Sequence, residues 1–171
     1  MWLRKVSASQ EDYDKFCSFS YYMLHWNHIT NHDLDLTVSP YAEKVCKEYG
    51  ITNESLKAKR EQFYSWENFR YLLDEMFFIE DFGKIYGYII LLGVKNKRGR
   101  NRKIKVYDWP MAYDADLEQF KFVFDELTKA RIIRKGDTVT AVSGNRISNI
   151  ILSNLGFHED EDIEFFYEKE I

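Results

Sequence analysis

The sequence predicts a mixed α/β fold, an α+β arrangement in which hairpins and then helical crossovers build one mixed sheet. Two apolar, β-type runs over residues 72–79 and 85–94 are separated by a short polar turn, as in a hairpin. Residues 114–135 carry apolar side chains at helical spacing. Residues 142–157 have the pattern of a strand end, a turn, a short helix and a new strand. The expected order is β-α-α-(α)-β-β-β-α-β-α-β-β.

Length and composition predict one domain over residues 1–171. The chain has 171 residues, 45% of them apolar and 17% aromatic, which is enough for a sizeable core. No apolar run approaches the roughly 20 residues that span a bilayer, and no signal-peptide pattern opens the chain. We therefore expect a cytoplasmic protein without a membrane partner. The net charge of −4 argues against a protein whose entire surface binds polyanions such as nucleic acids.

The first half of the chain is predicted to be one strand followed by helices. The expected elements are a strand over 2–6, a helix from Ser7 or Ser9 to Trp26, a loop over 27–38, a helix over 40–49 and a helical stretch from Thr52 to about Phe69.

The second half begins with the hairpin. Its turn is expected at residues 80–84, and its second strand is apolar enough to be central in the sheet. Gly87 within that strand predicts a bulge or a close backbone approach. A third strand is expected over 104–111. Asp114 or Asp116 then caps a long helix that ends near Lys135.

The stretch 145–157 is the most informative part of the sequence. Asn145 can cap a helix, and Gly156 can end it with a positive φ. Four apolar residues fall on one expected helix face: Ile147, Ile150, Ile151 and Leu155. Two short strands around an acidic turn are expected between Phe157 and Lys169.

The element order and this stretch resemble the GNAT fold, the fold of the Gcn5-related N-acetyltransferases. The family pattern has Asn, a small residue, Tyr, Gly and Phe at set spacings; the chain has Asn145, Ser148, Leu152, Gly156 and Phe157. The hairpin over 77–89, with its glycine in the second strand, also resembles that of the family. The resemblance implies a possible acetyl-CoA site. If CoA binds, the expected contact residues are Asn145, Trp109 and Met111.

Two departures from the family pattern point away from catalysis. Residues 110–118 stand where the family has a glycine-rich loop for the pyrophosphate of acetyl-CoA. They contain no glycine and carry Asp114, Asp116 and Glu118, which would repel phosphate. Leu152 takes the place of the tyrosine that can act as a general acid. The expectation is therefore that there is no catalytic residue and no cofactor.

The main functional hypothesis is a non-catalytic protein that acts through protein contacts or as a homo-oligomer. The same positions resemble the short GNAT-like proteins of tailed bacteriophages, which implies a virion-internal or structural component. One alternative is a CoA-dependent N-acetyltransferase with an atypical pyrophosphate loop. Another is a nucleic-acid-associated protein that uses the basic hairpin over 95–105. The expected interaction residues there are Lys95, Lys97, Arg98, Arg100, Arg102 and Lys103.

No metal site is expected. His25, His28 and His32 have compatible spacing, but no zinc-binding motif accompanies them. Exposed imidazoles at a helix end are the preferred interpretation. The acidic segment 159–170 is complementary in charge to the basic hairpin, so contact between the two is expected within the chain or between copies.

Overall fold

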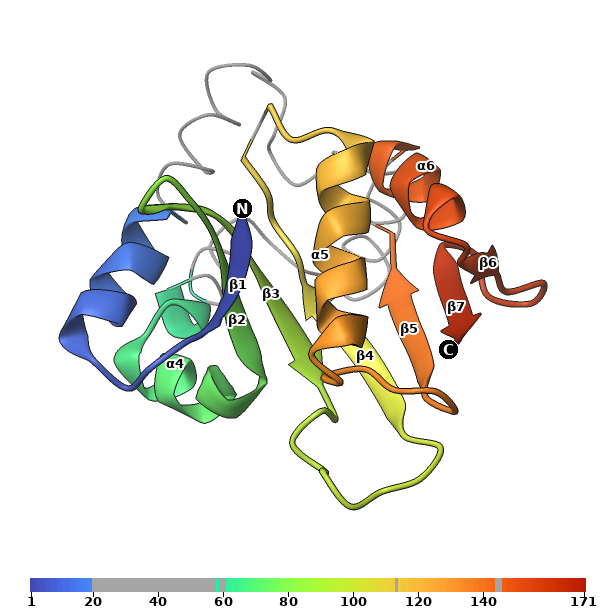
Figure 1. Cartoon of the computed structure of the whole chain (residues 1–171), viewed down its shortest axis with the longest axis horizontal. Helices are drawn as coiled ribbons and strands as arrows, with labels where there is room; N and C mark the ends of the chain where they lie inside the picture. Colours follow the sequence, from blue (N-terminus) through green and yellow to red (C-terminus); the bar gives the residue numbers. More distant parts are fainter. Residues whose placement is uncertain (20–57, 59–60, 113, 144–145) are drawn as a thin grey trace. The chain divides into compact units, whose positions relative to one another are not determined.

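The computed structural model describes residues 1–19, 58, 61–112, 114–143 and 146–171. The chain divides into two compact units, one of Met1–Val6 with Asp74–Ile171 and one of Ser7–Leu73. The larger unit contains the sheet (Figure 1). The expected single domain over 1–171 stays a prediction, and each unit is described by itself.

The sheet of the larger unit has seven strands in the order β1-β2-β3-β4-β5-β7-β6. All neighbouring strands are antiparallel except β4 and β5, which are parallel. The predicted mixed α/β fold is thereby confirmed. The strands are β1 (Trp2–Lys5), β2 (Met76–Asp81), β3 (Lys84–Leu92), β4 (Lys103–Asp108), β5 (Thr138–Val142), β6 (His158–Glu159) and β7 (Phe166–Glu170).

The β2–β3 hairpin is tighter than expected. Its turn consists of Phe82 and Gly83, both with positive φ, because Asp81 already pairs with Lys84. The expectation that a strand starts at Leu72 was wrong. Leu72 ends helix α4 (Trp66–Leu72), and a 3₁₀ turn, η1 (Leu73–Glu75), precedes β2. The central position of β3 is confirmed by its five consecutive buried residues.

Gly87 makes the predicted close backbone approach. It forms an antiparallel bridge with Met111, and a Cβ at this position would lie 2.7 Å from the carbonyl oxygen of Pro110. The register between β2 and β3 also shifts next to Gly87, as in a bulge. The third strand was expected to reach Met111, but β4 ends at Asp108, and Met111 keeps only this single bridge.

Helices α5 (Leu117–Lys129) and α6 (Arg146–Asn154) pack against one face of the sheet. Asp116 caps α5 in a reciprocal capping box with Gln119. The expected end of this helix near Lys135 was wrong. The helix ends at Lys129 because Arg131 takes a φ of +56° and the N–H groups of the next two residues turn back to Leu127. Gly136, next to the expected end, has a φ of +90° and lies in the turn before β5.

The apolar core lies between the sheet and these helices. Val123, Phe124 and Leu127 of α5 meet Ile89 and Leu91 of the central strand. From α6, Leu152 and Leu155 are buried in the same cluster.

The expected apolar face of α6 was therefore wrong in part. Ile147 and Ile150 are 70% and 53% exposed, because only the second half of α6 contributes to the core. Gly156 ends the helix as expected, with a φ of +82°. The two short strands after Phe157, β6 and β7, are also confirmed.

The smaller unit has a helix over residues 10–19. Ser9 is its cap, since its hydroxyl accepts a hydrogen bond from the N–H of Asp12 at 3.1 Å. Tyr13 packs against Trp66 and Phe69 of α4. The expected end of the first helix at Trp26, the loop over 27–38, the helix over 40–49 and the helical start at Thr52 lie outside the described residues. Within the described parts of the chain, no helix is long and apolar enough to cross a bilayer.

Candidate functional site

The sheet forks between β4 and β5. Their parallel ladder runs from Lys103 opposite Thr138 to Val106 opposite Ala141 and then stops. Beyond this point each strand stays with its other neighbour: Asp108 pairs with Ile90 of β3, and Val142 pairs with Phe166 of β7. The carboxyl ends of two adjacent parallel strands therefore diverge. This is the position where open α/β sheets bind ligands.

A bulge in β4 explains the divergence. Val106 pairs with Leu91, and Asp108 pairs with Ile90, which is the next residue along β3. Two residues of β4 therefore advance along one residue of β3, and the register shifts at this point. A bulge bends its strand and increases the local twist, which turns the end of β4 away from β5. The fork thus has a local cause in the pairing of β4.

Asp108 carries the carboxyl group at the mouth of the fork. The hydroxyl of Tyr88 donates a hydrogen bond of 2.7 Å to its Oδ2. Burial raises the pKa of Asp108, and the hydrogen bonds from Tyr88 and from the backbone N–H of Trp109 lower it only in part. A carboxyl group with a raised pKa at this end of the sheet is a candidate proton acceptor.

Trp109, an expected contact residue, follows directly in the chain. Its ring packs against Phe120 of α5 with 5.1 Å between the ring centroids. Its indole N–H is buried and has no hydrogen-bond partner among the described residues. Met111, the second expected contact, is a core residue with 5% of its surface exposed. The third, Asn145, lies outside the described residues.

The start of α5 lies next to this segment in the chain and is rich in carboxylates, as the sequence indicated. Asp114, Asp116 and Glu118 are all exposed. Asp114 accepts a hydrogen bond from Tyr86, and Glu118 pairs with Lys121 at 3.0 Å. The first N–H groups of a helix favour an anion, but these carboxylates already supply negative charge there.

Leu152 is buried, with 6% of its surface exposed, and belongs to the apolar core. The side chain therefore has no proton to give and no access to a ligand. Asp108 was missed by the sequence reasoning. The available signal was an acidic residue between aromatic residues in a β-type run, Val106-Tyr107-Asp108-Trp109.

The basic hairpin divides into exposed and buried residues. Five of the six expected interaction residues are exposed: Lys95, Lys97, Arg98, Arg100 and Lys103. Arg102 is only 5% exposed and forms a buried, bidentate pair with Asp137. Its guanidinium is therefore not available to a partner, and a contact through the other five stays a prediction.

Comparison with known proteins gives no family model and no curated relative that match the sequence. Solved structures do match the fold. The chain is similar to the PaiA N-acetyltransferase from Thermoplasma acidophilum, solved in complex with coenzyme A, with 13% identity, a TM-score of 0.61 and coverage of 99% of this chain and 98% of that one. The chain has the GNAT acetyltransferase fold. A GNAT-family acetyltransferase from Listeria monocytogenes 4b F2365 is similar too, with 12% identity, a TM-score of 0.55 and coverage of 99% and 94%.

This GNAT fold is the one that the stretch 145–157 and the hairpin resembled. At 12–13% identity the likeness concerns the fold alone. The activity of the chain depends on its own residues, because one fold serves many functions.

Proposed function

We propose that the protein is an N-acyltransferase that uses a CoA thioester, and that the fork between β4 and β5 holds the extended arm of this cosubstrate. The observation that carries the proposal is the end of the β4–β5 ladder at Val106 and Ala141, with both strands continuing beyond it. Past Val106, β4 stays paired with β3 through Asp108, and no described pair joins it to β5, so an extended ligand can lie between the two strands there. The PaiA structure with coenzyme A has the same fold.

Asp108 has the properties of a general base for this reaction. A CoA thioester would supply an activated acyl group. As the new C–N bond forms, the C–S bond breaks, the acceptor amine loses a proton, and CoA leaves as a thiolate that takes up a proton. Asp108 lies at the mouth of the fork with a raised pKa, which brings its proton affinity closer to neutral pH. Tyr88 is a positioning residue, because its hydroxyl holds the carboxyl group.

The fit of the chain to CoA is uneven. The fork suits the extended arm, whose two amide groups can pair with the backbone of a strand. The buried indole N–H of Trp109, the residue after Asp108, has no hydrogen-bond partner among the described residues. The start of α5 suits a diphosphate less well because of its three carboxylates. We therefore expect binding that is weaker than a glycine-rich loop would give.

Calorimetric titration tests the proposal. Acetyl-CoA is expected to bind one site with a Kd between about 10 and 100 μM, which corresponds to roughly 5.5–7 kcal/mol. S-acetylpantetheine, which lacks the diphosphate, is expected to bind only a few-fold more weakly if the fork provides most of the contacts. The absence of heat and of any thermal shift at 1 mM acetyl-CoA would rule out the proposed function. Mass spectrometry with a panel of amines then identifies the acceptor.

The second candidate is a non-catalytic GNAT-fold protein that acts through protein contacts. The observations that favour it are the acidic start of α5 and the burial of Leu152. The expected place in a phage virion stays a prediction, as does a nucleic-acid role for the hairpin. A failed acetyl-CoA titration together with a stable oligomer in analytical ultracentrifugation would favour this candidate over the enzyme.

A further inference from the structure

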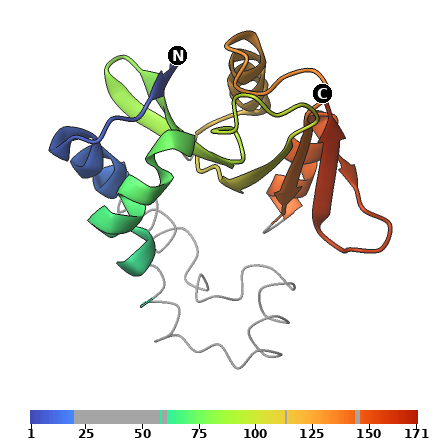
Figure 2. The same cartoon turned by 90° about the horizontal axis from the view of Figure 1, so that it is seen from below.

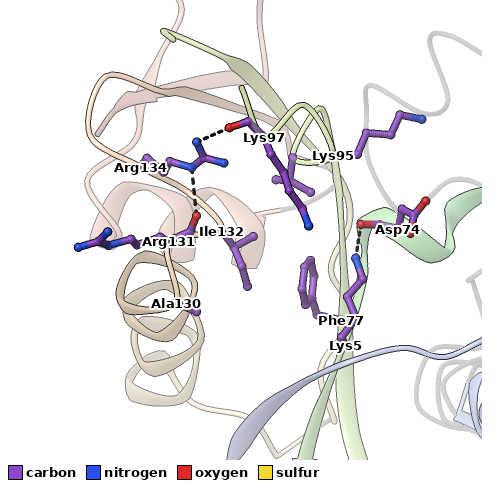
Figure 3. A pocket seen from close by; sticks show the side chains of 10 residues that line it. Lys5, Asp74, Phe77, Lys95, Lys97, Ala130, Arg131, Ile132 and Arg134 are labelled. Atoms are coloured by element: carbon purple, nitrogen blue, oxygen red, sulfur yellow. Dashed lines mark hydrogen bonds between the residues drawn. The ribbon is translucent and has the colours of Figure 1, made fainter. Parts of the chain in front are cut away.

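A pocket of about 600 Å³ lies at the end of the sheet opposite the fork (Figure 3). Its walls come from the end of β1, the start of β2, the β3–β4 connection and the loop after α5. The last two segments precede β4 and β5, so the pocket lies at the amino ends of these parallel strands, whereas the fork lies at their carboxyl ends. Figure 2 shows the backbone from below, the side on which the β3–β4 connection lies in Figure 1. The volume falls within the usual range for small-molecule sites.

The charge of the pocket is opposite to that of the whole chain. Five of the ten lining residues are cationic and one is acidic, whereas the chain has a net charge of −4. The cationic residues are Lys5, Lys95, Lys97, Arg131 and Arg134. The apolar part of the lining consists of Phe77, Val94, Ala130 and Ile132. This combination suits an anion that also has an apolar part.

Two of the five lining cations, Lys5 and Lys97, extend toward the same part of the pocket. Figure 3 shows both side chains reaching toward the space beside Phe77. The ammonium group of Lys5 lies 4.8 Å from the ring centroid of Phe77 and donates a hydrogen bond to the backbone carbonyl of Asp74. Among the described residues, the ammonium group of Lys97 has no carboxylate partner.

The two ammonium groups affect each other. Burial and the nearby charge of Lys97 lower the pKa of Lys5, and the charges of Asp74 and Glu75 oppose this effect. The fold therefore holds two like charges within electrostatic reach of each other. An anion between them would remove that repulsion.

The pocket is held open by buried and backbone contacts. Arg102 donates hydrogen bonds to the carbonyl oxygens of Val94 and Ile132, which lie on two different walls. Arg134 donates to the carbonyl oxygen of Lys97 at 2.8 Å and so ties the loop after α5 to the hairpin. The buried carboxylate of Glu75 accepts a hydrogen bond from the N–H of Gly93. A site that is already ordered loses little entropy when a ligand binds.

We propose that this pocket binds a small phosphorylated metabolite, with the phosphate between Lys5 and Lys97 and the apolar part of the ligand against Phe77 and Ile132. Phosphate is preferred over a simple carboxylate because it can accept hydrogen bonds from several donors at once. The size of the pocket suits a compound about as large as a nucleotide rather than a polymer. Arg134 also lines the pocket, although its guanidinium already donates to the carbonyl oxygens of Arg131 and Lys97.

Titration with ATP and with inorganic tripolyphosphate, both without metal, tests the proposal. One-site binding with a Kd below 1 mM is expected, and adenosine is expected not to bind at that concentration. Lys5→Met and Lys97→Met keep the apolar stems and remove the charges, so each is expected to weaken binding about 10- to 100-fold. Binding is also expected to be tighter at pH 7 than at pH 9.5, because the anion favours the protonated form of Lys5.

Arg98→Met is the matched control. Arg98 is an exposed cation of the same hairpin that does not line the pocket, so its removal should leave binding unchanged. Thermal unfolding of all variants checks that the fold is kept. The proposal is overturned if neither probe binds at 5 mM, or if Arg98→Met weakens binding as much as Lys97→Met does. It is also overturned if a 12-nucleotide DNA strand binds more tightly than ATP and the two lysine variants leave that binding unchanged.

Discussion

The hydroxyl group of Tyr88 lies 2.7 Å from Oδ2 of Asp108, two residues beyond the last pair of the β4–β5 ladder. Tyr88 is buried in the central strand, with 1% of its surface exposed, so its phenol is held in place. The hydrogen bond favours the ionised form of Asp108 and opposes the effect of burial. Tyr88, a residue of the central strand, thus lowers the pKa of the Asp108 carboxyl group at the fork.

The first prediction concerns Asp108→Asn. If Asp108 is the base, this change should lower kcat for acetyl transfer by about 10²- to 10⁴-fold, because the amide cannot accept the proton. Acetyl-CoA affinity should change little, since the backbone of the fork is kept. Steady-state kinetics and calorimetry measure the two effects separately. An unchanged kcat would remove Asp108 from the reaction.

Tyr88→Phe provides a test that does not depend on activity. The hydrogen bond from Tyr88 lowers the pKa of Asp108, so its loss should raise that pKa further. The side-chain carboxyl signal of Asp108 in carbon NMR should titrate at higher pH in the variant than in the parent chain. In the kinetic assay, the rising limb of kcat/KM against pH should move in the same direction, because only the ionised carboxylate accepts a proton. A titration shifted to lower pH would contradict this assignment.

The carboxylates at the start of α5 are predicted to limit CoA affinity. The triple change Asp114→Asn, Asp116→Asn and Glu118→Gln keeps a good helix cap at residue 116 and removes three negative charges. Acetyl-CoA should bind about tenfold more tightly at low salt, and the gain should shrink in 0.5 M salt. Asp125→Asn, an exposed site further along α5, is the control and should have no effect. Equal affinities in all three proteins would show that these charges do not face the ligand.

Arg102 and Asp137 are predicted to stabilise the fold. Both side chains are 3% exposed and form two hydrogen bonds with each other. Arg102→Met should lower the free energy of unfolding by about 3–5 kcal/mol, because it leaves Asp137 buried without its partner. Arg98→Met, at an exposed position, should stay within about 0.5 kcal/mol of the parent chain. Urea unfolding monitored by circular dichroism measures both.

The same pair predicts acid sensitivity. Burial alone would raise the pKa of Asp137, but the hydrogen bond and charge of Arg102, with the N–H of Arg134, lower it below the ordinary value. A carboxyl group with a lowered pKa stabilises the folded state above its unfolded pKa of about 4, and this stabilisation is lost as the pH falls further. The urea midpoint should therefore fall between pH 5 and pH 3. Asp137→Asn should weaken that dependence; an unchanged slope would contradict the assignment.

Two glycines are predicted to respond to alanine for different reasons. At Gly87 a Cβ would meet the backbone of Pro110 at 2.7 Å, so Gly87→Ala should cost about 1–3 kcal/mol and disturb the segment that leads to the fork. At Gly83 nothing lies within 4 Å, and only the φ of +74° opposes alanine, at a cost of about 1 kcal/mol. Only Gly87→Ala should reduce acetyl-CoA binding. Equal losses of binding would show that the close approach at Gly87 has no effect on the fork.

The sequence predicts features that follow from local patterns. The central strand, the role of Gly87, the cap at Asp116 and the helix end at Gly156 all depend on neighbouring residues, and the structure confirms them. Features that depend on distant contacts were missed. Arg102 has the same local pattern as the exposed cations around it, and only its pairing with Asp137, 35 residues away, makes it a buried residue.

The fork and the pocket also depend on contacts between residues that are distant in the sequence. The register shift in β4 depends on β3, and the pocket combines four separate segments. Likewise, Ile147 and Ile150 have helical spacing with Ile151, but only the position of α6 against the sheet decides which of them is buried.

The pairing of β4 with β5 has one closed end and one open end. The ion pair of Arg102 and Asp137 joins the two strands where their ladder begins. Past Val106 and Ala141, no described pair connects β4 with β5. We therefore expect the pairing between the two strands to open more readily at Val106 and Ala141 than next to the ion pair. Amide protons near Thr138 should then exchange with deuterium much more slowly than those near Val142. A ligand bound between the carboxyl ends of the two strands should reduce this difference in exchange rate.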